Sequence, residues 1–102
     1  MSDAEPPPGA SEPRPALHEV DFATHVLSLA SSAMVALGKM ATPSGETLTP
    51  DIDTARYLID VLGMLEAKTR GNLDESEAKL LHSLLYDLRV AYVDASAAAV
   101  KP

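Results

Sequence analysis

Hydrophobic residues recur every three or four positions in three separate stretches of the chain, which is the period of an amphipathic α-helix. The first stretch reads "FATHVLSLASSAMVALGKM". The segment "ATPSGETL" separates it from the second stretch, and "GNL" separates the second from the third. No stretch alternates hydrophobic and polar residues in the way a half-buried β-strand does. The pattern predicts an all-α fold with helices over about 21–40, 50–70 and 74–95.

Residues that begin helices precede the first two stretches. Asp21 and Thr49 each carry a side-chain oxygen that can accept a hydrogen bond from a free backbone N–H group, so we expect them to be N-caps. Pro50 would then be the first residue of the second helix, where its missing N–H group costs nothing. Pro43 and Gly45 interrupt the pattern between the two helices and predict a loop there.

The segment "KTRGNLDESE" contains signals for the end of one helix and the start of the next. Lys68 and Arg70 place positive charge near the negative end of the second helix dipole. A glycine that adopts the left-handed conformation can close this helix, and an Asp and a Glu three residues apart can form a capping box for the next helix. The residues predicted to build this bend are Gly71, Asn72, Leu73, Asp74 and Glu77.

Folding back at this bend makes an antiparallel pair of helices. Counting outward from the bend brings Arg56 close to Asp87. Arg89 is expected to form a partly solvated ion pair with a neighbouring acidic residue, since such pairs are common on helical surfaces. Whether Arg89, Asp87 and His82 do more than pair with neighbours is left open by the sequence.

Four blocks in this order, "FATHVLSLASSAMVALG", "LIDVLGML", "KTRGNL" and "LLHSLLYDLRVAY", resemble a small bacterial family catalogued as a domain of unknown function, DUF1844. The resemblance covers residues 22–92. Its most recognisable positions are Gly38, Asp60, Lys68, Gly71, Asn72, Leu73, Asp87, Arg89 and Tyr92. The family implies no known activity, so the resemblance supports the limits of the domain and transfers no catalytic residue.

Composition changes at the start of the first helix. The N-terminus "MSDAEPPPGASEPRPA" is rich in proline and acidic residues and has almost no large hydrophobic side chain, which predicts a disordered tail over residues 1–18. Residues 19–95 form the expected three-helix domain, and residues 96–102 an alanine-rich C-terminal tail. The N-terminus lacks the features of a secretory signal, so we expect a cytoplasmic protein.

The net charge of -7 and the scattering of the 8 lysines and arginines argue against binding to nucleic acid or to anionic lipid. The chain has no cysteine, which excludes disulfides, zinc thiolate sites and a thiol nucleophile. The partners expected from this composition are therefore proteins.

Candidate chemistry is sparse. His18, His25 and His82 are far apart in the sequence, and the Glu-x-x-His pairs of a di-iron helical bundle are absent. Asp60, His82 and Asp87 could be combined into an acid–base set, but no marked nucleophile accompanies them. We therefore expect no enzyme, no catalytic residue, no metal site and no cofactor.

A second hydrophobic stripe lies outside the main one on the second and third helices, and the outer side of the first helix is polar but nearly uncharged. Small hydroxyl and methyl groups allow two helices to approach closely. Because most soluble oligomers are two-fold dimers, we expect these residues to pack against a second copy of the chain. The candidate interface is Thr24, Ser28, Ser31, Ser32, Val35, Tyr57, Val61, Met64, Tyr86, Val90 and Val93.

The sequence predicts a non-enzymatic, homo-oligomeric module for protein interaction or assembly. The alternative is a carrier of a small ligand or cofactor, with an apolar pocket between the helices. A helix lying on a membrane surface is disfavoured because the first helix contains a single lysine and no arginine. A stable oligomer without a bound small molecule would favour the first function, and a monomer with a bound ligand the second.

Overall fold

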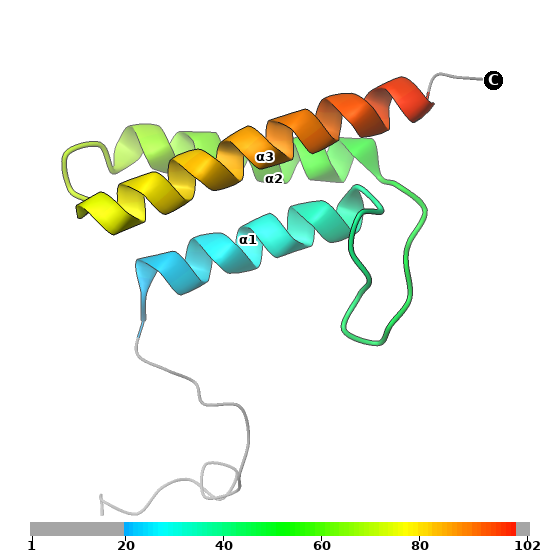
Figure 1. The fold of residues 1–102 in the computed structure, drawn as a ribbon, viewed down its shortest axis with the longest axis horizontal. Helices are drawn as coiled ribbons and strands as arrows, with labels where there is room; N and C mark the ends of the chain where they lie inside the picture. The colour runs from blue at the N-terminus through cyan, green and yellow to red at the C-terminus, as the bar shows by residue number, and fades with distance from the viewer. Residues whose placement is uncertain (1–19, 100–102) are drawn as a thin grey trace, which may run out of the picture.

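The protein forms a bundle of three α-helices in the computed structural model, which describes residues 20–99. The helices are α1 (Phe22–Ala36), α2 (Ile52–Lys68) and α3 (Glu75–Ala99), and no strand occurs within the described residues. Figure 1 shows α2 and α3 as an antiparallel hairpin with α1 beside it, and every pair of helices is in contact. The predicted all-α fold is confirmed; the tail predicted for residues 1–18 lies outside the described residues.

Each helix directs one face toward a common core, and every buried residue in it is hydrophobic. α1 contributes mainly alanine, which lets it approach the larger side chains of the hairpin closely. The main cluster is Val26, Ala30, Ala33, Ile59, Leu62, Leu81, Leu85 and Leu88. A smaller cluster of Ala36, Leu37, Ala55 and Ala95 continues the core toward the end of α1.

Aspartate caps the start of both α1 and α2. The Asp21 carboxylate accepts hydrogen bonds from the Thr24 backbone N–H (3.0 Å) and hydroxyl (2.6 Å), which confirms the predicted cap. Asp51 accepts the same two bonds from Thr54, at 3.1 and 2.7 Å. The threonine hydroxyl, followed by the backbone N–H, lowers the pKa of each carboxyl group. The prediction that Thr49 is the N-cap was wrong, because a carboxylate two residues later accepts both bonds.

The two candidate caps of α2 can be separated by mutation. Asp51→Ala is expected to lower the melting temperature by several degrees, on the order of 5 °C, because it removes the acceptor for both hydrogen bonds at the helix start. Thr49→Ala serves as the matched control and should leave the melting curve, followed by circular dichroism, nearly unchanged. A larger loss for Thr49→Ala than for Asp51→Ala would contradict this assignment.

α1 ends at Ala36, earlier than the expected end near residue 40. Gly38 has a φ of 75°, in the left-handed region that favours glycine. The Gly38 N–H donates to the Val35 carbonyl (3.0 Å) and the Lys39 N–H donates to the Met34 carbonyl (2.9 Å). These two bonds form the Schellman motif, which satisfies carbonyl groups at a helix end. Gly38, and not the later proline, therefore ends the helix.

The bend between α2 and α3 follows the predicted stop. Lys68 lies in the last turn of α2, and the Thr69 hydroxyl donates to the Leu65 carbonyl at 2.6 Å. Gly71 has a φ of 87°, and the Asn72 N–H donates to the Thr69 carbonyl at 2.8 Å. Gly71 thus adopts the predicted left-handed conformation, as the third residue of a turn that starts after the helix end.

The predicted capping box of α3 is confirmed. The Asp74 carboxylate accepts from the Glu77 N–H at 2.8 Å, and the Glu77 carboxylate accepts from the Asp74 N–H at 3.0 Å. The Glu77 N–H, followed by the Ser76 hydroxyl, lowers the pKa of Asp74. Leu73 packs against the core just outside the cap. Alanine favours helix, and α3 accordingly continues to Ala99, beyond the expected end at 95.

Candidate protein interface

The outer face of α1 is exposed and polar. Val26, Ala30 and Ala33 turn toward the hairpin and are buried, so the opposite side of α1 points away from α2 and α3. The candidate interface residues of α1 lie on that side or at its edge: Thr24, Ser28, Ser31 and Ser32 are exposed, Val35 is half-buried, and Ser31 borders the groove between α1 and α3. The Thr24 hydroxyl is already bonded to the capping carboxylate of α1.

The second stripes of α2 and α3 also lie at the surface. Tyr57 is 68% exposed and Met64 50%, and on α3 Tyr86, Val90 and Val93 are 53 to 66% exposed. The candidate residue Val61 is half-buried. The structure thus leaves five large hydrophobic side chains of the hairpin half or more in contact with solvent.

A shallow groove of about 200 Å³ runs between α2 and α3 beside these stripes. Its charged residues are Arg56, Asp60 and Arg89, and Arg56 Nε lies 3.9 Å from Asp60 Oδ2. The Arg89 guanidinium lies against α2, because a Cβ atom placed on Gly63 would be 3.4 Å from Arg89 Nη2. Arg89 forms no ion pair with any residue of the range 20–99.

Two expected pairings are therefore wrong. Asp87 lies on the flank of α3 that faces α1, away from Arg56, because residues 87 and 89 are separated by about 200° around the helix. Arg89, which we expected to pair with a neighbouring acid, is left without such a partner in the described structure. Counting from the bend also misplaced the pair along the helices, because the contact between Glu66 and His82 puts Arg56 level with Tyr92, about 7.5 Å from the height of Asp87.

A second groove, between α1 and α3, was missed by the sequence reasoning. It has a volume of about 240 Å³, and its lining includes Leu27, Met34, Met40 and Leu84, with Asp87 at its edge. Leu27 is 45% exposed and Met40 43%. The sequence did contain a signal for this groove: Leu27 and Met34 are seven residues apart, so they lie on the same side of α1, next to its buried face.

The two grooves show that the candidate interface is divided between different sides of the bundle. α3 meets α1 along one flank, through Leu84 and Leu88, and borders the α2 groove along the other, through Arg89 and Val93. Thr24 and Ser28 of α1 point away from the hairpin and Ser31 lies at the edge of the α1–α3 groove, whereas Arg89 and Val93 line the groove on the other flank of α3. The candidate residues therefore belong to two surfaces of the bundle, and the expected interface that contains both stays a prediction.

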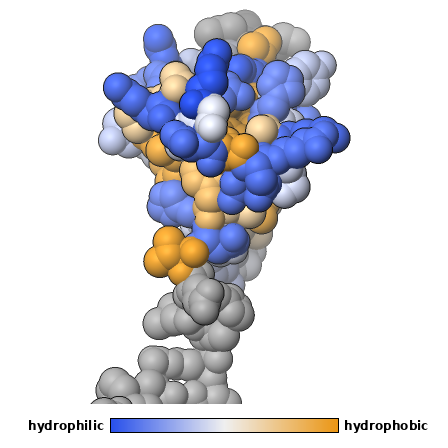
Figure 2. Space-filling view, turned by 90° about the vertical axis from the view of Figure 1, so that its left-hand side faces the viewer, coloured by the Kyte–Doolittle hydropathy of each residue, from blue (hydrophilic) through white to orange (hydrophobic). Residues whose placement is uncertain are grey.

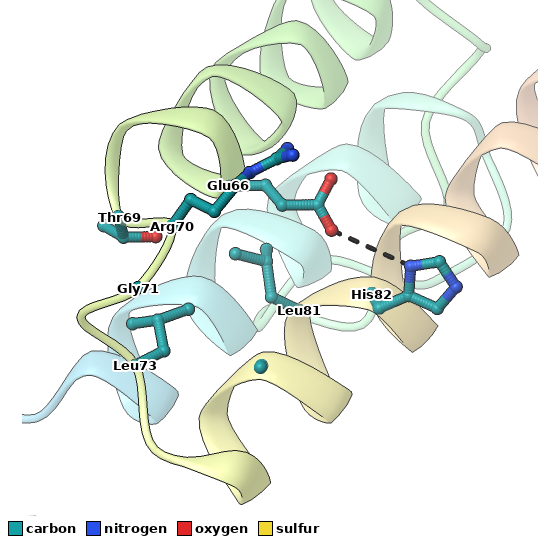
Figure 3. A pocket seen from close by; sticks show the side chains of 8 residues that line it. Glu66, Thr69, Arg70, Gly71, Leu73, Leu81 and His82 are labelled. Carbon is teal, nitrogen blue, oxygen red and sulfur yellow. Dashed lines mark ion pairs between the residues drawn. The ribbon is translucent and has the colours of Figure 1, made fainter.

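The largest of these hollows, about 500 Å³, lies at the α2–α3 bend. In Figure 3, Glu66 of α2 and His82 of α3 point toward one another, and their Oε2 and Nδ1 atoms are 3.8 Å apart. Leu73 and Leu81 lie between the two helices at this end. Figure 2 views the same end of the bundle, where hydrophilic side chains surround a narrow strip of hydrophobic surface. The hollow is open to solvent, and both charged and hydrophobic side chains line it.

The family model described as "Domain of unknown function (DUF1844)" matches residues 19–94. The chain belongs to the DUF1844 family. No curated protein and no solved structure matches the chain significantly.

The family match spans α1, α2 and most of α3 of this DUF1844 domain, so it includes both grooves and the bend. Within residues 20–99, no three His, Cys, Asp or Glu side chains are placed to hold a metal ion together. None of the helices described in the domain has the length and hydrophobicity needed to cross a membrane. The features that distinguish its described surface are therefore exposed hydrophobic side chains and the charged groove between them.

Proposed function

We propose that this DUF1844 domain is a non-enzymatic module that associates with other copies of itself through the outer face of the α2–α3 hairpin. The observation that carries the proposal is the exposure of large hydrophobic side chains on two adjacent helices. Contiguous exposed hydrophobic surface of this kind marks protein contacts, in which aromatic residues and methionine are enriched. The residues of this hairpin face are Tyr57, Met64, Tyr86, Val90 and Val93.

The size of the core supports association. Twelve hydrophobic residues are buried and five of them are alanine, so the three helices bury little hydrophobic area for their length. Small domains of this kind have only a few kcal/mol from a single core. Covering the hairpin face with a second copy would remove further hydrophobic area from water. The free energy of this burial is favourable by about 25 cal/mol per Å², before the costs of association are subtracted.

The proposal predicts a dimer that glutamates on the hairpin face disrupt. The double variant Met64→Glu, Val93→Glu places four like charges in a two-fold interface while sparing the core, since both side chains are half or more exposed. Light scattering combined with size exclusion should report a dimer for the parent chain and a monomer for the variant. Circular dichroism should show equal helix content in the two proteins.

The matched control places the same two charges on the other side of the bundle. Ser28→Glu, Ser31→Glu changes the exposed face of α1, and this variant should remain dimeric. A parent that is monomeric at high concentration would overturn the proposal. If the control becomes monomeric and the hairpin variant remains dimeric, the interface is the serine face of α1 and not the hairpin.

The alternative function, a carrier of a small ligand or cofactor, has one supporting observation. The hollow at the α2–α3 bend, with a volume of about 500 Å³, lies within the range of ligand pockets. Its rim is open, however, whereas ligand pockets bury most of the ligand surface. Native mass spectrometry distinguishes the two functions, because a carrier would be a monomer that retains a small molecule, and an assembly module a dimer that retains none.

A further inference from the structure

Residues at the same position along the hairpin axis, which we call the same height, have complementary charge on α2 and α3. The contact between Glu66 and His82 shows which residues of the two antiparallel helices lie at the same height. Asp60 lies six residues before Glu66 and Arg89 seven residues after His82. At a rise of about 1.5 Å per residue, Asp60 lies about 9 Å and Arg89 about 10.5 Å from that contact. Asp60 and Arg89 therefore face each other across the groove that both of them line.

The hydrophobic side chains of the hairpin face follow the same register. Tyr57 of α2 lies near the height of Val93 of α3, and Met64 near the height of Tyr86, to within about one helical turn. Each half of the hairpin face, one on α2 and one on α3, thus has hydrophobic residues at the two ends and a charged residue between them. The charged residue between them is acidic on the α2 half, at Asp60, with Arg56 one helical turn away from it, and basic on the α3 half, at Arg89.

We propose, resting on the dimeric function above, that two copies pack through this face about a two-fold axis running along the α2–α3 groove. Such an axis lays α2 of one copy on α3 of the other and preserves the heights. Arg89 then meets the partner's Asp60, and the symmetry repeats this contact a second time. Tyr57 meets the partner's Val93, and Met64 meets the partner's Tyr86, so hydrophobic residues cover hydrophobic residues.

Charge selects this axis over the other in-plane choice. A two-fold axis running across the helices would lay α2 on α2 and α3 on α3, which opposes Arg89 to the partner's Arg89. Like charges facing each other across an interface are unfavourable, whereas complementary charges set the register. Arg89 is available for such a contact because it has no ion pair among the described residues. Asp60 has only an exposed contact with Arg56, at 3.9 Å.

Charge reversal tests the pairing. Arg89→Asp alone would oppose two aspartates at both contacts, and Asp60→Arg alone would oppose two arginines, so each variant should dimerise at least tenfold more weakly than the parent. An equimolar mixture should recover the dimer as a heterodimer, because each contact then joins one aspartate and one arginine. Native mass spectrometry identifies the heterodimer by its mass. Recovery on mixing is specific to a contact between chains, since a contact within one chain cannot be restored by another molecule.

A control variant and the state of the parent chain separate failure of this arrangement from failure of the proposed function. Asp87→Arg reverses a charge on the opposite flank of α3 and should leave the dimer intact. A monomeric parent would contradict the proposed function itself. A dimeric parent whose reversed variants stay dimeric, or whose folded monomeric variants fail to combine, would overturn this arrangement alone. If reversal unfolds a variant, Arg89→Gln and Asp60→Asn test the same contact, and their effects on dimerisation should be less than additive when combined.

Discussion

Leu81→Ala is expected to lower the free energy of unfolding by about 2 to 5 kcal/mol, as measured by urea denaturation. The Leu81 side chain is completely buried where the three helices meet, and it belongs to the main core cluster. Removing it forfeits its burial and leaves a cavity that three packed helices close only in part. Since a single core of this size supplies only a few kcal/mol, this loss is a large fraction of the total.

The matched control is a leucine of the same size at the surface. Leu48 lies in the loop between α1 and α2 and is 46% exposed, so Leu48→Ala should cost within about 0.5 kcal/mol. Equal losses for the two variants would mean that the core is not where the packing of the three helices places it. The comparison should be made at fixed protein concentration, because association contributes to stability.

Gly38→Val is expected to destabilise the protein more than Gly71→Val does. Both glycines have a positive φ, 75° and 87°, which a β-branched residue adopts only with strain of about 1 to 3 kcal/mol. A side chain at Gly38 would also meet the Pro50 ring at 3.1 Å and the Leu48 carbonyl oxygen at 3.2 Å. Crowding of this kind costs about 1 to 3 kcal/mol more. Gly71 has nothing within 4 Å of the added atom, so its cost is that of the backbone alone.

Thermal melting measures both glycine variants against a third. Gly63 lies inside α2 at a helical φ, and an added Cβ atom would be in ordinary contact with Arg89. Gly63→Ala should therefore maintain the melting temperature or raise it, because alanine is more favourable than glycine inside a helix by up to about 1 kcal/mol. A melting temperature of Gly71→Val equal to that of the parent would show that the bend does not require the left-handed conformation.

Most of the fold could be predicted because its signals are local. The three helices follow from the spacing of hydrophobic residues, and the start of α3 follows from the Asp74–Glu77 pair, which lies within one helical turn. The second hydrophobic stripes were also predicted, because position around a helix depends only on residue number. The prediction failed where two signals competed within a few residues, as for Thr49 and Asp51 at the start of α2.

The local signals in the sequence determined which residues form helices, where the chain bends, and which side of each helix is hydrophobic. Only the tertiary structure decided how each helix is rotated against its neighbours. That rotation separates Arg56 from Asp87, leaves Arg89 beside Asp60, and places the serines of α1 on a different side from the hairpin face. The physical reason is that the packing of three helices, including the close approach of the alanines of α1 to the hairpin, depends on side chains far apart in the chain, which no local pattern relates.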